Sequence, residues 1–341
     1  MTKVTLKIIA KTLGISIATV SKALKDYPDI SKKTKQKVLK LAKTLNYKPN
    51  SFAQSLRNQE SKIIGLIIPS IVHHFFSNVI NGVINAASEK GYLVIILQTE
   101  ESYENEKKQL QLLVEKNIDG ILLSLSDKTV RYDHVKQVIS EGIPVVLYDK
   151  ISKSVNCSKV IIDDKKAAFN ATEYLIKTGC KRIAHIRGSL KPQTTIDRFM
   201  GYRKALETYN IPFDKSLVYV SEELSYENGY DLTDQIIDDH PDLDGVFAFT
   251  DLVATGVLTK LKERSIHIPN KVSVIGFSNW FLSKITSPTL STIDQPGYEM
   301  GLKAFDLLHK EINQIKKGLP VNYEVVEIST KVVPRNSTKT L

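Results

Sequence analysis

The sequence predicts a small all-α domain followed by a larger α/β domain, and two observations carry that prediction. The first is charge: residues 1–62 contain 14 Lys and Arg against 3 Asp and Glu, whereas the remaining residues contain 33 against 34. The second is periodicity, because the basic segment shows apolar stripes at helical spacing, and from residue 63 onward short β-rich runs alternate with helical stretches. With 341 residues, 42% of them hydrophobic, the chain is long enough for two or three domains with buried cores.

Three short helices are predicted within the basic segment. Apolar residues recur at i, i+3, i+4 and i+7 over Leu6–Leu13, and Thr5 can cap this helix. Gly14 supplies a tight turn to a second helix over Ile17–Leu24, and Ser31 can cap a third helix with a similar stripe. Two short helices joined by a glycine turn and followed by a third predict a helix-turn-helix module.

The excess of positive charge indicates that this module binds a polyanion, and DNA phosphates fit best. In a helix-turn-helix the second helix enters the major groove with its first residues on base edges. Ile17 or Ala18 can then contact a thymine methyl group and Lys22 can donate to guanine, although Lys22 as a solvated helix cation stays an alternative. Phosphate contacts are expected from the polar residues Thr5, Ser16, Thr19, Ser21 and Asn46.

At these residues the chain resembles the LacI family of bacterial transcription regulators. The likeness rests on residues 4–10, 14–24 and 46–57. It continues, in the order that the family shows, through residues 62–69, 120–122, Arg198 with Gly201 and Tyr202, and 274–277.

The resemblance implies three parts: a DNA-binding head over 1–48, a hinge over 49–60, and an effector-binding and dimerisation domain over 61–341. The last part is expected to have the periplasmic-binding-protein type I fold, with two doubly wound subdomains joined by three crossovers. The first subdomain is expected at about 61–161 plus 293–321, and the second at about 162–291 plus 322–335.

The hinge is expected to become helical only when it binds, because residues 50–58 are too few for a stable isolated helix. In the family two such segments pair in the minor groove, where a leucine pries open the central base step. Leu56 takes that place here, Arg57 is the adjacent minor-groove or phosphate cation, and Ala53 is small enough to let two hinges approach. An inert linker is the alternative.

The α/β part is predicted from nine β-rich runs, at 63–69, 93–99, 120–124, 145–149, 160–163, 183–187, 217–220, 246–249 and 272–277. The tail adds a strand at 291–294, a helix at 298–316 and a strand pair within 321–333, and its last residues, 334–341, are expected to fray.

Ligands of open α/β sheets bind beyond the carboxyl ends of the strands, where this chain is unusually polar. The effector-binding candidates are Ser70, Phe75, Phe76, Asp149, Thr194, Arg198, Leu224, Asp251, Ser278 and Trp280. Their charged groups can bind hydroxyls and their aromatic rings can stack on a sugar or base, so a small polar effector is expected. Asp251 is also a possible cap of the helix that follows it. Ser278 stands where the family usually has an acidic residue, which weakens any specific sugar assignment.

The sequence gives less support to an enzyme, a cofactor-binding protein or a metal site. None of the 16 glycines forms a G-x-G, and no catalytic motif is present, so neither an enzyme nor a cofactor is expected. Cys157 and Cys180 are expected to be reduced structural thiols, and His73 and His74 to be solvated loop histidines without a metal.

We therefore expect a cytoplasmic, homodimeric transcriptional repressor of a near-palindromic operator, with no membrane segment. A cytosolic ligand-binding sensor without a DNA role is the second hypothesis. The sequence does not identify the effector. It also does not show whether the effector releases the protein from DNA or promotes binding, whether the protein represses or activates transcription, or whether it forms tetramers. A phosphoprotein in place of a small molecule also stays possible as the signal.

Overall fold

The computed structural model describes residues 4–47, 60–221 and 223–341. Contacts divide the chain into two units, 1–61 and 62–341, each described here by itself. No helix within the described residues is both long and apolar enough to cross a membrane.

The first unit consists of three helices around a small core. They are α1 (Leu6–Leu13), α2 (Ile17–Leu24) and α3 (Lys32–Thr44), with the predicted bounds of the first two. Gly14 adopts a left-handed conformation with φ of 64°, which ends α1 and starts the turn. Ile9, Val20 and Val38 are fully buried at the centre, one from each helix, so the three apolar stripes meet as predicted.

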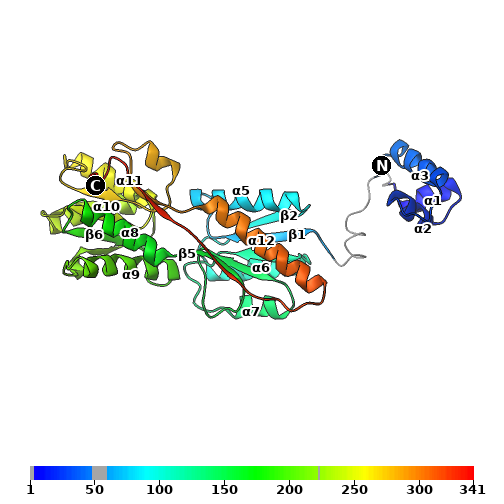
Figure 1. The fold of residues 1–341 in the computed structure, drawn as a ribbon, viewed down its shortest axis with the longest axis horizontal. Helices are drawn as coiled ribbons and strands as arrows, with labels where there is room; N and C mark the ends of the chain where they lie inside the picture. Colours follow the sequence, from blue (N-terminus) through cyan, green and yellow to red (C-terminus); the bar gives the residue numbers. More distant parts are fainter. Residues whose placement is uncertain (1–3, 48–59, 222) are drawn as a thin grey trace. The chain divides into compact units, whose positions relative to one another are not determined.

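The second unit contains two parallel sheets, each covered by helices on both faces (Figure 1). The first sheet has the order β11-β5-β4-β3-β1-β2. Its strands are β1 (Ile63–Ile68), β2 (Leu93–Gln98), β3 (Gly120–Leu123), β4 (Val145–Tyr148), β5 (Lys159–Ile162) and β11 (Val325–Ile328). Its helices are α5 (His74–Glu89), α6 (Tyr103–Glu115), α7 (Asp133–Ser140) and α12 (Gly297–Lys316), and α5 lies beside α12 on one face.

The second sheet has the order β7-β6-β8-β9. Its strands are β6 (Ile183–Arg187), β7 (Val218–Val220), β8 (Gly245–Ala248) and β9 (Ser273–Ile275). Its helices are α8 (Asp164–Lys177), α9 (Gln193–Thr208), α10 (Tyr226–Asp239) and α11 (Asp251–Glu263), with the short 3-10 turns η1 (Lys215–Leu217) and η2 (Phe281–Lys284).

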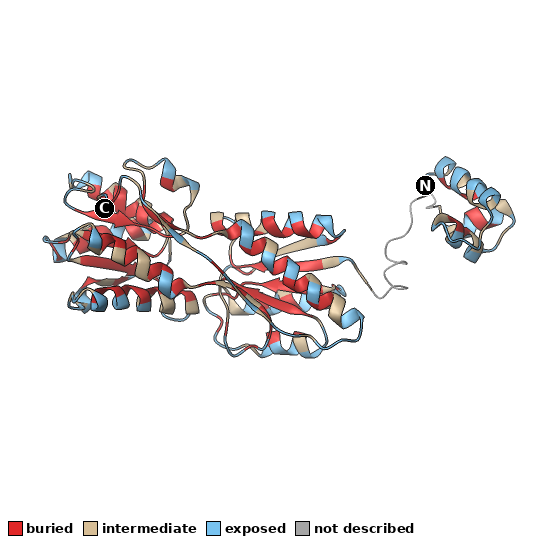
Figure 2. Ribbon diagram, viewed as in Figure 1, coloured by how far each residue is buried: buried red, intermediate tan, exposed pale blue. Residues whose placement is uncertain are grey.

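The chain passes between the subdomains three times: after β5, along β10 (Thr292–Asp294), and along β12 (Lys331–Val333), which pairs antiparallel with β10. Buried residues concentrate in the central strands of both sheets and on the helix faces that cover them, as Figure 2 shows. Helices α5 and α12 approach closely through Gly82 and Gly301, because a Cβ on either glycine would lie 2.2 Å from a carbonyl oxygen of the other helix.

Two sequence-based expectations for the tail are wrong. Strand β11 does not pair with β12 but joins the first sheet beside β5, so residues 325–328 lie in the first subdomain rather than the second. The end of the chain is packed rather than frayed: Ser337 is fully buried, its hydroxyl donates to the Val274 carbonyl at 2.6 Å, and its carbonyl accepts from the Val274 N–H. The sequence pattern did not indicate this contact, because Ser337 is polar and the prediction of buried segments relied on apolar residues.

Candidate functional site

The exposed face of α2 is the candidate DNA-reading surface of the first unit. Val20 and Ala23 anchor the helix in the core, which leaves Ile17 47% exposed and Ala18 and Lys22 on the surface. Lys22 forms an ion pair with Asp29. Because both partners are about half exposed, this pair contributes little stability and Lys22 can exchange Asp29 for a base or phosphate.

Of the predicted phosphate contacts, Thr5, Ser16 and Asn46 are exposed at helix ends, whereas Thr19 and Ser21 lie within α2 and are half-buried. The Ser16 hydroxyl accepts the Thr19 N–H at 3.0 Å and so caps α2. Thr5 precedes α1 but its side chain makes no capping bond, contrary to the prediction. Asn46 is exposed with a left-handed φ of 48°, just beyond α3, and Ser21 is half-buried. Exposed helix N-termini favour anions, so Thr5 and Ser16 remain suitably placed for phosphates. Ala53, Leu56 and Arg57 lie outside the described residues.

The candidate effector site lies between the two subdomains of the second unit, beyond the carboxyl ends of both sheets. Five non-glycine residues there have left-handed backbone conformations: Glu100, Glu101, Asp149, Ser278 and Asn279. Such conformations cost free energy and concentrate at functional sites. They follow β2, β4 and β9, at the strand ends where the sequence predicts the effector site.

Asp149 and Gln295 connect the first subdomain with the crossover after β10. The Gln295 side-chain amide donates to the Asp149 carboxylate at 2.9 Å, and both residues are buried. Burial raises the pKa of Asp149, although Lys150 and Arg198 oppose the shift. One carboxylate oxygen of Asp149 therefore already accepts a hydrogen bond from within the protein.

Arg198 is held by a buried ion pair rather than pointing free into the crevice. Its Nε donates to Asp164 at 2.7 Å and its Nη1 donates to the Phe249 carbonyl at 3.0 Å. The guanidinium lies 3.6 Å from the centre of the Phe277 ring. Burial raises the pKa of Asp164 to about 7, even though Arg198 favours its charged form. Asp164 lies 34 residues before Arg198 in the chain, and no local pattern indicates it as the partner.

Asp251 is the first residue of α11, and the helix is capped by Thr250 instead, whose hydroxyl accepts the Val253 N–H. The Asp251 carboxylate accepts the Thr292 hydroxyl and the Trp280 N–H, both at 2.6 Å. Burial raises the pKa of Asp251 to about 6. The structure therefore assigns Asp251 to holding the loop after β9, and the alternative of a helix cap is wrong.

Ser278 and Asn279 are tied to the crossover strands. The Ser278 hydroxyl donates to Gln295 at 3.2 Å, and the Asn279 amide donates to Asp294 at 2.9 Å. Arg335, from the tail, donates to the Asn279 side-chain oxygen at 2.6 Å. Sequence reasoning missed Gln295 and Arg335, because nothing in the local pattern brings a tail arginine to this loop.

The aromatic candidates differ in exposure. Phe75 and Phe76 are buried in the core of the first subdomain and pack edge to face with ring centres 5.2 Å apart, so they serve packing rather than stacking on a ligand. Trp280 is half-buried and faces His74 of α5 at 6.1 Å between ring centres. His73 and His74 are themselves half-buried, and burial lowers the pKa of both, which contradicts the expected solvated histidines.

The remaining candidates lie at the same edge. Ser70 is half-buried just after β1, Thr194 is buried in the first turn of α9, and Leu224 is half-buried in the loop before α10, close to Gly188. Cys157 and Cys180 are buried free thiols, as predicted.

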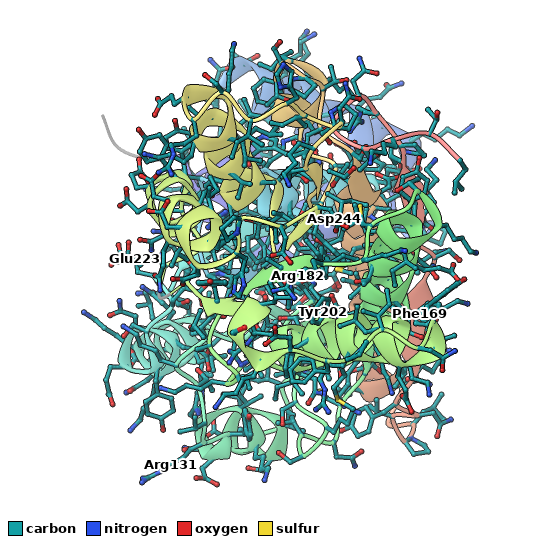
Figure 3. The ribbon with its side chains drawn as sticks, turned by 90° about the vertical axis from the view of Figure 1, so that its left-hand side faces the viewer. Arg131, Phe169, Arg182, Tyr202, Glu223 and Asp244 are labelled. Carbon is teal, nitrogen blue, oxygen red and sulfur yellow. The ribbon has the colours of Figure 1, made fainter. Side chains whose placement is uncertain are left out.

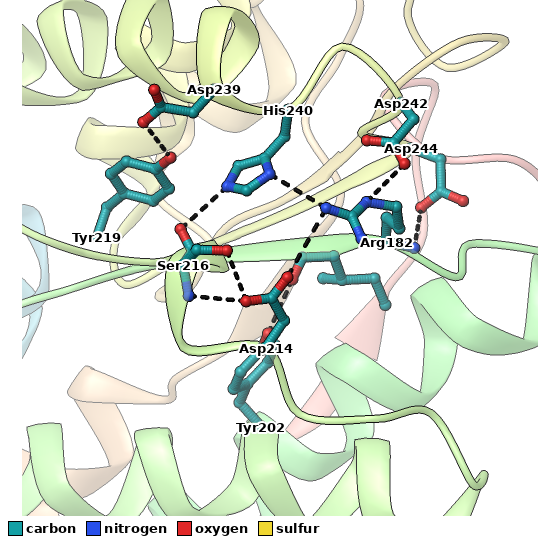
Figure 4. Close-up of polar contacts among 10 residues, drawn as sticks. Arg182, Tyr202, Asp214, Ser216, Tyr219, Asp239, His240, Asp242 and Asp244 are labelled. Carbon is teal, nitrogen blue, oxygen red and sulfur yellow. Dashed lines mark hydrogen bonds and ion pairs between the residues drawn. The ribbon is translucent and has the colours of Figure 1, made fainter.

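A second polar cluster lies at the opposite edge of the second sheet, where β6 and β8 begin (Figures 3 and 4). Arg182 forms an ion pair with Asp242 at 2.9 Å and donates to His240 Nδ1 at 3.1 Å. His240 Nε2 in turn donates to the Ser216 carbonyl at 3.1 Å. Arg182 also lies 3.8 Å from Asp214, so the cluster ties the start of β6 to the loops before η1 and β8, and we assign it a structural role.

A basic three-helix head with an exposed reading helix, joined to two α/β subdomains around a polar crevice, defines a ligand-responsive DNA-binding regulator. The chain belongs to the lacI family of bacterial regulatory proteins. The family model with that description matches residues 5–50. A second model, described as periplasmic binding proteins and sugar binding domain of the LacI family, matches residues 61–330.

Relatives and solved structures agree. The ribose operon repressor of Halalkalibacterium halodurans is 35% identical, over 98% of this chain and 97% of the relative. The structure of a transcriptional regulator, CelR, in complex with cellobiose is 26% identical and covers 98% of this chain and 99% of its own, with a TM-score of 0.72. The lac repressor dimer bound to operator shares the fold, with a TM-score of 0.86, 22% identity and coverage of 99% and 100%.

Membership confirms the predicted fold class and the role of DNA-binding repressor. This family regulates transcription rather than catalysing a reaction. The match over residues 5–50 also argues against the second hypothesis, a sensor without a DNA role.

Proposed function

We propose that the protein is a homodimeric repressor that reads a near-palindromic operator in the bacterial cytoplasm, with one head on each half-site. One head reads too few base pairs to select a single site in a genome, and a two-fold dimer doubles the reading length. The main support for this proposal is the position of helix α2. Val20 and Ala23 are buried and hold the helix against the core, and this fixes the exposed residues Ile17, Ala18 and Lys22 on one surface.

The effector is a small polar molecule of the sugar class that binds between the two subdomains. The polar residues at the strand ends and the strained backbone at Asp149, Ser278 and Asn279 support this site. The names of the ribose operon repressor and of the cellobiose complex support the ligand class.

The effector acts by changing the arrangement of the subdomains. The bond from Gln295 to Asp149 spans them, because it joins the crossover after β10 to the loop after β4 of the first subdomain, and we expect it to adjust when a ligand enters. Ligand binding then shifts a two-state equilibrium that the DNA-binding head reads through the segment 49–60.

The test is a titration of a selected operator with wild type, Lys22→Ala and the control Lys33→Ala. A guanine contact predicts a loss of about 1–3 kcal/mol for Lys22→Ala, with relaxed preference at one base pair. Lys33 lies on α3 and is exposed, so its removal should weaken all DNA sequences alike. If Lys22→Ala weakens specific and non-specific DNA equally, Lys22 contacts only phosphates.

A further inference from the structure

The segment between α2 and α3 places an acid beside the DNA-reading helix. Within residues 4–47 the only acidic residues are Asp26 and Asp29, both in this segment, against ten lysines. Lys22 is the only charged residue of α2, and Asp29 forms an ion pair with it. An acid beside a surface that binds DNA weakens the attraction of that surface for phosphates.

The loop after α2 holds the backbone of Asp29 in a fixed position. On one side of Asp29, the Tyr27 N–H donates to the Lys22 carbonyl at 3.1 Å and ties the loop to the end of α2. On the other side, Ile30 packs against the core of the three helices. The loop therefore presents the Asp29 carboxylate to Lys22 from a position that is anchored on both sides.

Both partners of the ion pair are charged and accessible. The hydrogen bond from Lys22 lowers the pKa of Asp29, and the same bond raises the pKa of Lys22. The two side chains are 47% and 50% exposed, so a base or a phosphate can reach them. Because a free lysine side chain is flexible, the pair restricts Lys22 while leaving it on the surface.

The pair responds differently to a base edge and to a phosphate. A lysine ammonium has three N–H donors, and Asp29 accepts from Lys22 through one carboxylate oxygen. The other donors can bind O6 and N7 of guanine, which carry no formal charge, while the ion pair stays intact. A phosphate that binds Lys22 instead brings a second anion close to the Asp29 carboxylate, and the two negative charges repel each other.

We propose that Asp29 is a specificity-determining residue that holds Lys22 for contact with bases and opposes its contact with phosphates. The inference rests on the proposed function and deepens it by naming the residue that makes the reading lysine selective. Selective binding often uses a repulsive element against the wrong partner, and Asp29 supplies one against non-specific DNA. Since it acts through Lys22, Asp29 is a positioning residue.

The test compares the affinities of the full-length protein for two DNA duplexes at one salt concentration. One duplex is an operator selected from a random library, and the other has the same length and base composition in a scrambled sequence. Asp29→Asn should lower the ratio of operator affinity to scrambled affinity about tenfold, or about threefold for each of two heads, as expected for an exposed ion pair. Tighter binding of the scrambled duplex should account for most of the change.

Asp26→Asn is the matched control, because it removes the same charge from the same loop. Asp26 pairs with Lys35 of α3 at 2.6 Å and not with the reading helix. This variant should strengthen binding of both duplexes alike and leave the ratio unchanged.

Two further variants separate a role through Lys22 from a general effect of charge. Asp29→Glu retains a carboxylate and should keep the ratio close to that of wild type. In a Lys22→Ala background, Asp29→Asn should no longer change the ratio, because the partner through which it acts is absent.

An unchanged ratio for Asp29→Asn would overturn the inference. An equal fall for Asp26→Asn, or a fall of the same size in the Lys22→Ala background, would overturn it as well, because either result assigns the effect to charge alone. The two proposals fail separately. A wild-type protein that selects no operator contradicts the proposed function, whereas a protein that selects an operator and keeps its ratio in Asp29→Asn retains that function and loses this inference.

Discussion

Single residues at the crevice carry charges that the fold both buries and restrains. Arg198 and Asp164 form a buried pair in which removal of one partner leaves an uncompensated charge. The pKa of Asp164, raised to about 7 by burial, makes the cost of that removal depend on pH.

Arg198→Met should therefore destabilise the protein more at pH 8.5 than at pH 5.5. At the lower pH Asp164 holds a proton in the folded protein and is neutral, whereas at the higher pH it has to ionise without its partner. The loss at high pH should reach about 3–5 kcal/mol. Urea unfolding of the wild type and the variant at both values measures the difference.

The double variant Arg198→Met with Asp164→Asn is the control, because it has no carboxyl at position 164 to ionise. Its loss of stability relative to wild type should be less dependent on pH than that of Arg198→Met alone. An equal loss for Arg198→Met at both pH values would contradict the account of this pair.

The residues that sequence reasoning found and those that it missed differ in kind. Asp149, Arg198 and Asp251 were found because each follows a recognisable strand or motif. Gln295 and Arg335 were missed, because their partners lie 146 and 56 residues away and no local pattern encodes such a contact.

At the scale of the element, α12 carries an acid on its buried face. Glu311 is 2% exposed, and burial raises its pKa to about 7, with the Glu324 carboxylate adding to the effect. Between the unfolded value of 4.5 and about 7 the folded protein retains a proton that the unfolded chain has lost. The stability that this proton provides is present at low pH and is lost as pH rises through that window.

Glu311→Gln should remove this dependence, since glutamine does not titrate. Relative to wild type, the variant should gain about 3 kcal/mol between pH 4.5 and pH 8, at about 1.4 kcal/mol per pKa unit. Chemical denaturation of both proteins at several pH values measures it. Parallel pH profiles for the two proteins would mean that Glu311 does not titrate in this range.

Most elements were predictable because their signals are local. The stripes of α1 and α2 and the buried runs of the parallel strands predicted their bounds to within a few residues. Strand β11 was assigned to the wrong subdomain, since its alternating burial fits either sheet and its partner, β5, lies far away in the chain.

At the scale of the whole molecule, the distribution of charge differs between the part that binds DNA and the part proposed to bind the effector. The positive charge resides in the first 62 residues, and the rest of the chain is close to neutral. A neutral unit has little attraction for DNA phosphates at physiological salt, so it can open and close around a ligand without binding DNA itself.

The most direct test of this division compares the full chain with a protein lacking residues 1–60 on the same selected operator. We expect the shortened protein to lose sequence-selective binding altogether while it still binds the effector of the full chain. Sequence-selective operator binding by the shortened protein, at the affinity of the full chain, would contradict the account.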